Sequence, residues 1–188
     1  LSGSIGAIAR PLAAIFGLGS LAGIVAITRS FANWGNEIRN TASLLGITND
    51  EASKLQQFGK LTGTDAAGDL QTYQDRQNQI KYGGDGKGQQ ANQLLQVDTK
   101  KTYEENLIHA VEHGNEMVRQ GKWNQSAYRE VMQSAGFDPK FAGQDPQRIR
   151  HQMNVAKENA KETARFAPDA QKLNDQILEA TGRIDVLK

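Results

Sequence analysis

Two histidines and a glutamate fall at a spacing that can bind a catalytic metal ion. His109, Glu112 and His113 match H-x-x-E-H, the inverted signature of zinc peptidases. In a helix, the two histidines lie on one face, so both rings can bind one Zn²⁺ while Glu112 acts as general base for a metal-bound water. A third ligand must come from further along the chain, and the candidates are Glu158, Glu162 and Glu179.

The same helix has a second, simpler interpretation. Its apolar face centres on Leu107, Val111 and Gly114, which turns His109 away from the core and leaves His113 at the side. Both histidines then share a polar face with glutamates, as solvated pairs at i, i+4 spacing do. A peptidase also needs a substrate cleft, and the chain has few apolar residues with which to build one. We therefore predict no enzymatic activity and no cofactor, and keep His109, Glu112 and His113 only as candidate metal ligands.

The N-terminal part of the chain carries an uncharged apolar stretch. Residues 11–28 contain no charged side chain and are flanked by arginines. At about 1.5 Å rise per residue, such a helix extends roughly 27 Å, close to the hydrocarbon core of a bilayer. Gly19 and Gly23 form a G-x-x-x-G pattern, in which small residues let helix backbones approach closely in lipid. Residues 1–28 are predicted to form an apolar helix that either crosses a membrane or is buried in a helical bundle.

Helix-forming and helix-ending residues alternate through the polar remainder. Thr48 with Glu51, and Thr102 with Glu105, are capping boxes, which open helices. Apolar residues recur at spacings of three and four, and no stretch alternates as a strand would. Four glycines crowd residues 83–88. Because each glycine costs about 1 kcal/mol in a helix, we predict a hinge there. A phosphate-binding loop is not expected, since the stretch lacks the Lys-Ser/Thr ending and the preceding strand. The predicted regions after residue 28 are 29–82, the hinge 83–88, 89–144 and 145–188.

The last region, residues 145–188, has the spacing of a coiled coil. Its apolar residues repeat at alternating steps of four and three, in two phases separated by Pro168. The first phase is mostly alanine, so a lone pair of such helices would be marginally stable. An ordinary amphipathic helix pair is the alternative. The oligomer seam that we predict consists of Ile149, Met153, Leu173, Ile177, Ile184 and Leu187.

Composition limits what this chain can bury and bind. Only 38% of its residues are hydrophobic and 6% are aromatic, so we expect no large core and predict helices that bury their faces against other copies. The net charge of +1, with acidic and basic residues interleaved, predicts at most non-specific contact with DNA. The absence of cysteine excludes disulfides and thiolate metal sites. The predicted fold class is all-α, with extended helical hairpins or a bundle, an N-terminal apolar helix of membrane length, a coiled-coil-like C-terminal region, and oligomeric assembly.

Residues 29–81 resemble a stretch of bacteriophage tail tape-measure proteins. In that family a helix with an aromatic residue, here Trp34, is followed by a Leu-Gly-Ile-Ser/Thr turn, here residues 45–48. A short helix rich in Leu and Gln follows, here at 55–57, and then a glycine-led turn into another helix, here at 63–71. An apolar segment before this pattern is also similar to the family. The resemblance covers about a third of the chain, which we expect to be a fragment of a longer protein.

The resemblance implies an extended, mostly helical protein in the lumen of a viral tail tube. Such proteins determine tail length, occupy the tube and the tail tip, and leave ahead of the genome, assisting its ejection through the host inner membrane. The resemblance also implies self-association as a homotrimer, contacts with tail-tube and tail-tip or baseplate hub proteins, and a location in the virion and then at the host membrane. Two other functions stay open: a single-pass membrane or secreted membrane-inserting helical protein, and an H-x-x-E-H zinc peptidase.

Overall fold

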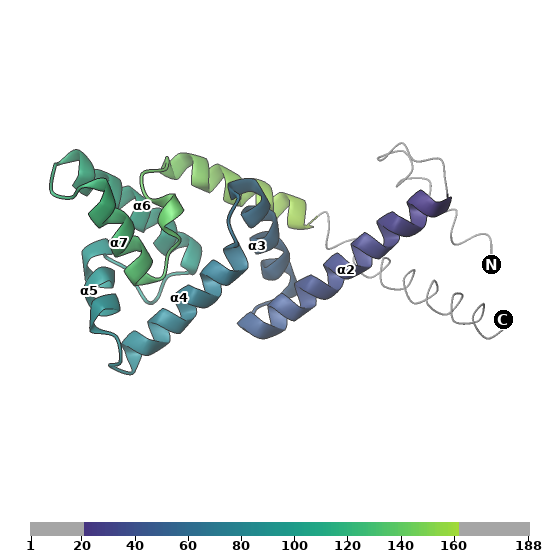
Figure 1. The fold of residues 1–188 in the computed structure, drawn as a ribbon, viewed down its shortest axis with the longest axis horizontal. Coiled ribbons are helices and arrows are strands. Elements are labelled where there is room, and N and C mark those ends of the chain that lie inside the picture. Colours follow the sequence, from purple (N-terminus) through teal and green to yellow (C-terminus); the bar gives the residue numbers. More distant parts are fainter. Residues whose placement is uncertain (1–20, 162–188) are drawn as a thin grey trace. The chain divides into compact units, whose positions relative to one another are not determined.

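Helices and the turns that join them make up the part of the chain that the structure describes (Figure 1). The computed structural model describes the backbone of residues 21–161 and the side chains of residues 33–161. No strand occurs between residues 21 and 161, and the predicted all-α class is confirmed. The elements are α2 (Leu21–Leu45), α3 (Asn49–Thr62), α4 (Ala66–Lys81), α5 (Gly86–Leu95), α6 (Tyr103–Arg119), α7 (Gln125–Ala135), η1 (Pro139–Phe141) and a helix over residues 146–161.

The helix α2 runs without a break across the boundary that we predicted after residue 28. Over the described residues it extends from Leu21, within the apolar stretch, through polar sequence to Leu45. Between residues 21 and 161, the structure contains no helix with both the length and the apolar character that a membrane span requires. The predicted apolar helix is therefore not a separate element in this part of the chain. Gly23 lies in α2, whereas Gly19 lies outside the described residues.

Residues 41–161 form one compact unit, in which several helices end in the same hydrogen-bonded turn and three of these turns also bury an apolar side chain. At each of these three turns a helix is followed by a residue with positive φ: Gly46 (64°), Gln96 (55°) and Gly136 (93°). The next amide donates to the carbonyl five positions earlier, at 3.0, 2.9 and 3.0 Å, which is the Schellman pattern. The residues that carry these amides then pack against the core, and they are Ile47, Val97 and Phe137.

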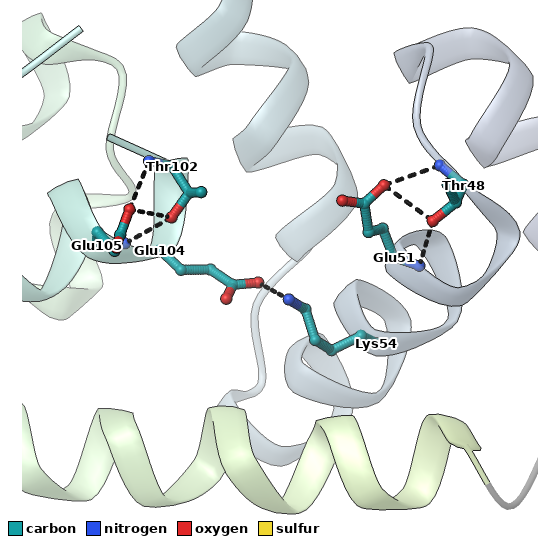
Figure 2. Close-up of polar contacts among 6 residues, drawn as sticks. All are labelled: Thr48, Glu51, Lys54, Thr102, Glu104 and Glu105. Carbon is teal, nitrogen blue, oxygen red and sulfur yellow. Dashed lines mark hydrogen bonds and ion pairs between the residues drawn. The ribbon is translucent and has the colours of Figure 1, made fainter. Parts of the chain in front are cut away.

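Both predicted capping boxes are present, and each opens a helix (Figure 2). The Thr48 hydroxyl accepts from the Glu51 amide at 3.2 Å, and the Glu51 carboxylate accepts from the Thr48 amide at 2.9 Å. Thr102 and Glu105 repeat the exchange at 3.3 and 2.8 Å. Because the ionised carboxylates accept these hydrogen bonds, the pKa of both glutamates is held below its usual range.

The glycine-rich stretch 83–88 is helical in its second half, so the predicted hinge was wrong there. The helix α5 begins at Gly86, because the Asp85 side chain caps it by accepting from the Gly88 amide at 2.9 Å. Arg76 of α4 pairs with the same carboxylate at 2.6 Å and ties the turn to α4. A Cβ at Gly88 would lie 2.3 Å from Asp85 Oδ2, so glycine permits this arrangement. The cap and the ion pair together offset the low helix propensity of glycine.

One hydrophobic core draws on the helices of residues 41–161, from Leu45 at the end of α2 to Ala156 in the last helix. The expectation that these helices lack a core of their own was therefore wrong, because the few large apolar residues gather in one place. The largest fully buried side chains with apolar bodies include those of Leu95, Leu107, Val111, Tyr128, Met132, Phe141 and Ile149.

The helix over residues 146–161 belongs to this same core. Ile149 and Met153, which we predicted for an oligomer seam, are 0% and 7% exposed and pack within the chain itself. Their assignment to the seam was wrong, and so was a division of the chain after residue 144. The remaining seam residues lie outside the described part of the chain, and they are Leu173, Ile177, Ile184 and Leu187.

The packing of α7 on α6 requires the absence of a side chain at Gly114. Tyr128 is fully buried, its hydroxyl donates to the Val111 carbonyl at 3.1 Å, and a Cβ on Gly114 would lie 2.0 Å from its ring. Gly114→Ala should therefore lower the free energy of unfolding by about 2–3 kcal/mol, the usual cost of overpacking. Gly86→Ala, with nothing within 4 Å of the added carbon, should change it little. Equal stability of the two variants in chemical denaturation would contradict this packing.

Within the described residues, Gln96 is the one residue other than glycine with positive φ. Gln96→Gly should raise the free energy of unfolding by about 1 kcal/mol, because glycine adopts this φ without steric cost. Gln93→Gly, on the exposed side of the same helix, should instead lower it by about 1 kcal/mol. Thermal unfolding of both variants measures the difference, and a loss of stability in Gln96→Gly would show that the left-handed turn does not form.

Candidate functional site

The two histidines of the H-x-x-E-H motif lie one turn apart on α6, outside the row of its fully buried residues. Both are half-buried, and their rings stack with centroids 6.3 Å apart and 18° between the planes. His113 also meets Trp123 edge-on, with 6.2 Å between ring centroids. Since Trp123 itself packs against the core, His113 takes part in the packing beside α7.

The glutamate of the motif is bound by a cation. Arg150, on the helix over residues 146–161, donates to Glu112 Oε1 at 2.6 Å, and each side chain is 40% exposed. Arg150 therefore competes with any metal ion for the Glu112 carboxylate. Glu158, a candidate third ligand, pairs with Lys161 at 2.8 Å, and the other two, Glu162 and Glu179, lie outside the described residues. In residues 33–161 no group of three or more histidine or acidic side chains is placed to hold a metal ion.

A surface hollow with a volume of about 260 Å³ lies beside this ion pair. Two of its carboxylates are already engaged, since Glu112 binds Arg150 and Glu105 belongs to the Thr102 capping box. Two basic and two acidic side chains line it, so the hollow has no net preference for a charged ligand. Its lining consists of Lys101, Glu105, Ile108, His109, Glu112 and Arg150.

A second polar cluster, which we refer to as the acidic corner, consists of Asp65, Asp69, Asp138 and Tyr103. Asp65 and Asp69 lie at the start of α4, Asp138 precedes η1, and Tyr103 opens α6. Burial and the charges of Asp138 and Asp65 raise the pKa of Asp69 to about 7. Burial, together with the charges of Asp69 and Asp138, raises the pKa of Tyr103 well above its usual range.

The loop that leads into α6 is fixed by a buried amide. Asn106 is 1% exposed, and its Oδ1 accepts from the Asp98 amide at 2.9 Å. Its Nδ2 donates to the Asp98 carbonyl at 2.8 Å and to the Tyr73 hydroxyl at 3.1 Å. These bonds fasten the loop before α6 to Asn106, and they link α6 to α4 through Tyr73, close to the Thr102 capping box.

Sequence analysis missed the acidic corner and Asn106. The one local signal was the i, i+4 pair of aspartates at 65 and 69, because like charges at this spacing repel in an isolated helix. Asp138 and Tyr103 join that pair only through tertiary packing, in which the ring of Tyr103 lies 5.3 Å from Tyr73 between centroids. No periodicity in the sequence could have placed them together.

Comparison with known proteins gives no match to a protein-family model, to a curated protein or to a solved structure.

Calorimetric titration of the full chain with Zn²⁺ tests the H-x-x-E-H motif directly. Because Arg150 occupies Glu112, we expect no binding tighter than about 10 µM and no difference between the wild type and a His109→Ala/His113→Ala variant. A micromolar or tighter site that the double substitution abolishes would restore the metal hypothesis. Arg150→Ala, which frees the glutamate, is the matched control for the effect of the ion pair.

Proposed function

We propose that this chain is part of a bacteriophage tail tape-measure protein. One observation carries the proposal: the residues of the family resemblance have defined structural roles. Gly46 follows the end of α2, Thr48 caps α3, and Gly63, with a φ of 68°, ends α3 before α4. Three leucines of the pattern, Leu45, Leu55 and Leu70, are buried in the core, and Ile47 packs against it. The resemblance is therefore supported by the way in which the pattern builds three successive helices.

In this proposal residues 41–161 are a folded helical module carried on a longer chain. A compact unit of about 120 residues has a radius of gyration of about 14 Å, whereas one continuous helix of that length would extend about 180 Å. We thus propose a compact body in the lumen of the tail tube or at the tail tip, in place of the fully extended form that the resemblance implies. Such a module acts by assembly with other subunits, and tail length remains a property of the whole protein.

The other parts of the proposal concern residues outside this module. Copies of the chain associate, as a homotrimer, through heptad residues in 162–188, namely Leu173, Ile177, Ile184 and Leu187. Residues 1–28, with Gly19 and Gly23, assist the passage of the genome through the host inner membrane. The partners are tail-tube and tail-tip or baseplate hub proteins in the virion, and genomic DNA is contacted at most non-specifically.

Cross-linking in purified tailed particles tests this proposal. Lysines that are exposed in the module, such as Lys100, Lys122 and Lys157, should form cross-links to tail-tube or hub subunits that mass spectrometry identifies. The matched control is the same particle after genome ejection, in which these cross-links should be lost because the protein leaves ahead of the DNA. Absence of the chain from the particles, or its presence without any cross-link to a tail subunit, would overturn the proposal.

A further inference from the structure

Two polar atoms of the acidic corner are buried without a hydrogen-bond partner. They are the Oδ2 atom of Asp69 and the hydroxyl of Tyr103, whose ring packs against Tyr73 and Phe137. An unpaired polar atom in a protein interior is costly, and an unpaired negative charge there costs more. A proton on Asp69 removes that charge, so the protonation state of this carboxyl matters for the stability of the corner.

The other two carboxylates of the corner are engaged with the backbone. Asp65 Oδ1 accepts from the Gly68 amide at 3.1 Å and caps α4, and Asp138 Oδ1 accepts from the Lys140 amide at 2.8 Å and caps η1. Both roles favour the ionised form, because a carboxylate is the stronger acceptor. Asp69 caps no helix, and its charged form is favoured first by the nearby Lys140 cation and to a smaller extent by the Thr64 side chain. The proton of the corner is therefore carried by Asp69.

The elements that meet at this corner approach one another closely. A Cβ on Gly59 would lie 2.7 Å from the Thr64 carbonyl oxygen, so the end of α3 contacts the turn into α4 directly. From η1, the Lys140 ammonium group reaches the carbonyl oxygen of Gly63 in the same turn, at 3.5 Å. When Asp69 is ionised, its negative charge repels that of Asp138 across this contact. The repulsion acts to separate the turn from η1.

We propose that the acidic corner is a proton-controlled latch: a proton on Asp69 keeps the α3–α4 turn closed on η1 and α6, and its loss loosens that contact. The latch is a property of residues 41–161 and does not depend on what the chain assembles with.

The charges around Asp69 determine the pH at which the latch acts. Asp65 on α4 and Asp138 before η1 oppose its ionisation, and the cation of Lys140 favours it only in part. On the α6 side lie Tyr103 and Glu104, and the charge of Glu104 is offset by its ion pair with Lys54 of α3 (Figure 2). The balance favours the neutral acid, in agreement with the raised pKa of about 7 for Asp69.

The direction of the pH dependence follows from this raised pKa. An aspartate in the open turn has a pKa of about 3.9, whereas in the closed corner the pKa is about 7, so only the closed form keeps the proton between these values. Stabilisation by the proton is complete below about pH 4, decreases as the pH rises through about 7, and is absent above that. The opening equilibrium should therefore rise by up to about tenfold for each pH unit between 5 and 7 and then level off.

Amide hydrogen exchange of the full chain between pH 5 and 8, corrected for intrinsic exchange rates, tests the latch. In the wild type, protection of residues 63–69 and 138–142 should fall with rising pH up to about 7. In Asp69→Asn, which keeps a neutral side chain of the same shape, protection should be independent of pH. Asp75→Asn, an exposed substitution on the same helix, is the matched control and should behave as the wild type does.

Two results would overturn the latch. One is a wild-type protection that does not change from pH 5 to 8, and the other is a fall of the same size in Asp69→Asn. A second measurement does not depend on the folding of any variant, since the ¹³C shift of the Asp69 carboxyl in the wild type reports its protonation directly. A titration midpoint near pH 7 is expected, and a midpoint below 5 would exclude the latch.

Discussion

Short helices pack around one core more readily when a connecting turn both satisfies the backbone groups that it frees and buries an apolar side chain at the same place. In residues 41–161 three turns do both in the same way. After α2, α5 and α7, a residue with positive φ reverses the chain, and the next residue, Ile47, Val97 or Phe137, both completes the Schellman hydrogen bond and packs against the core. The turns therefore contribute side chains to the core as well as connecting the helices. This contribution lets a chain with few large apolar residues form a hydrophobic core.

The polar groups that this architecture buries gather at the same junctions. Asn106 fixes the loop before α6 through hydrogen bonds to Asp98 and the Tyr73 hydroxyl. Both polar atoms of its side chain, Oδ1 and Nδ2, therefore have partners. At the acidic corner the requirement is not met, since Asp69 and Tyr103 each keep an unpaired atom. A fully satisfied network contributes rigidity, whereas a partly satisfied one makes stability depend on protons. The H-x-x-E-H face differs from both, because Arg150 neutralises Glu112 in a half-exposed setting where an ion pair contributes little.

Local features of the fold could be predicted from the sequence, and long-range ones could not. The capping boxes at Thr48 and Thr102 were predicted correctly because all their atoms lie within four residues. The start of α5 at Gly86 was missed because the glycines hid the local Asp85 cap, which Arg76 of the preceding helix supports, and the left-handed Gln96 was missed because no rule of composition selects glutamine there. Ile149 and Met153 show the same limit. Their spacing indicates an apolar face, but it does not say whether that face meets another copy or the chain's own core.

Residues 41–161 enclose a core of their own, without help from other copies of the chain. Amide hydrogen exchange on the full chain at two protein concentrations, tenfold or more apart, tests this independence. The slowest-exchanging amides should lie around Leu107, Val111, Tyr128 and Ile149, with the same protection at both concentrations. Protection at these residues that decreases on dilution would show instead that their burial depends on association.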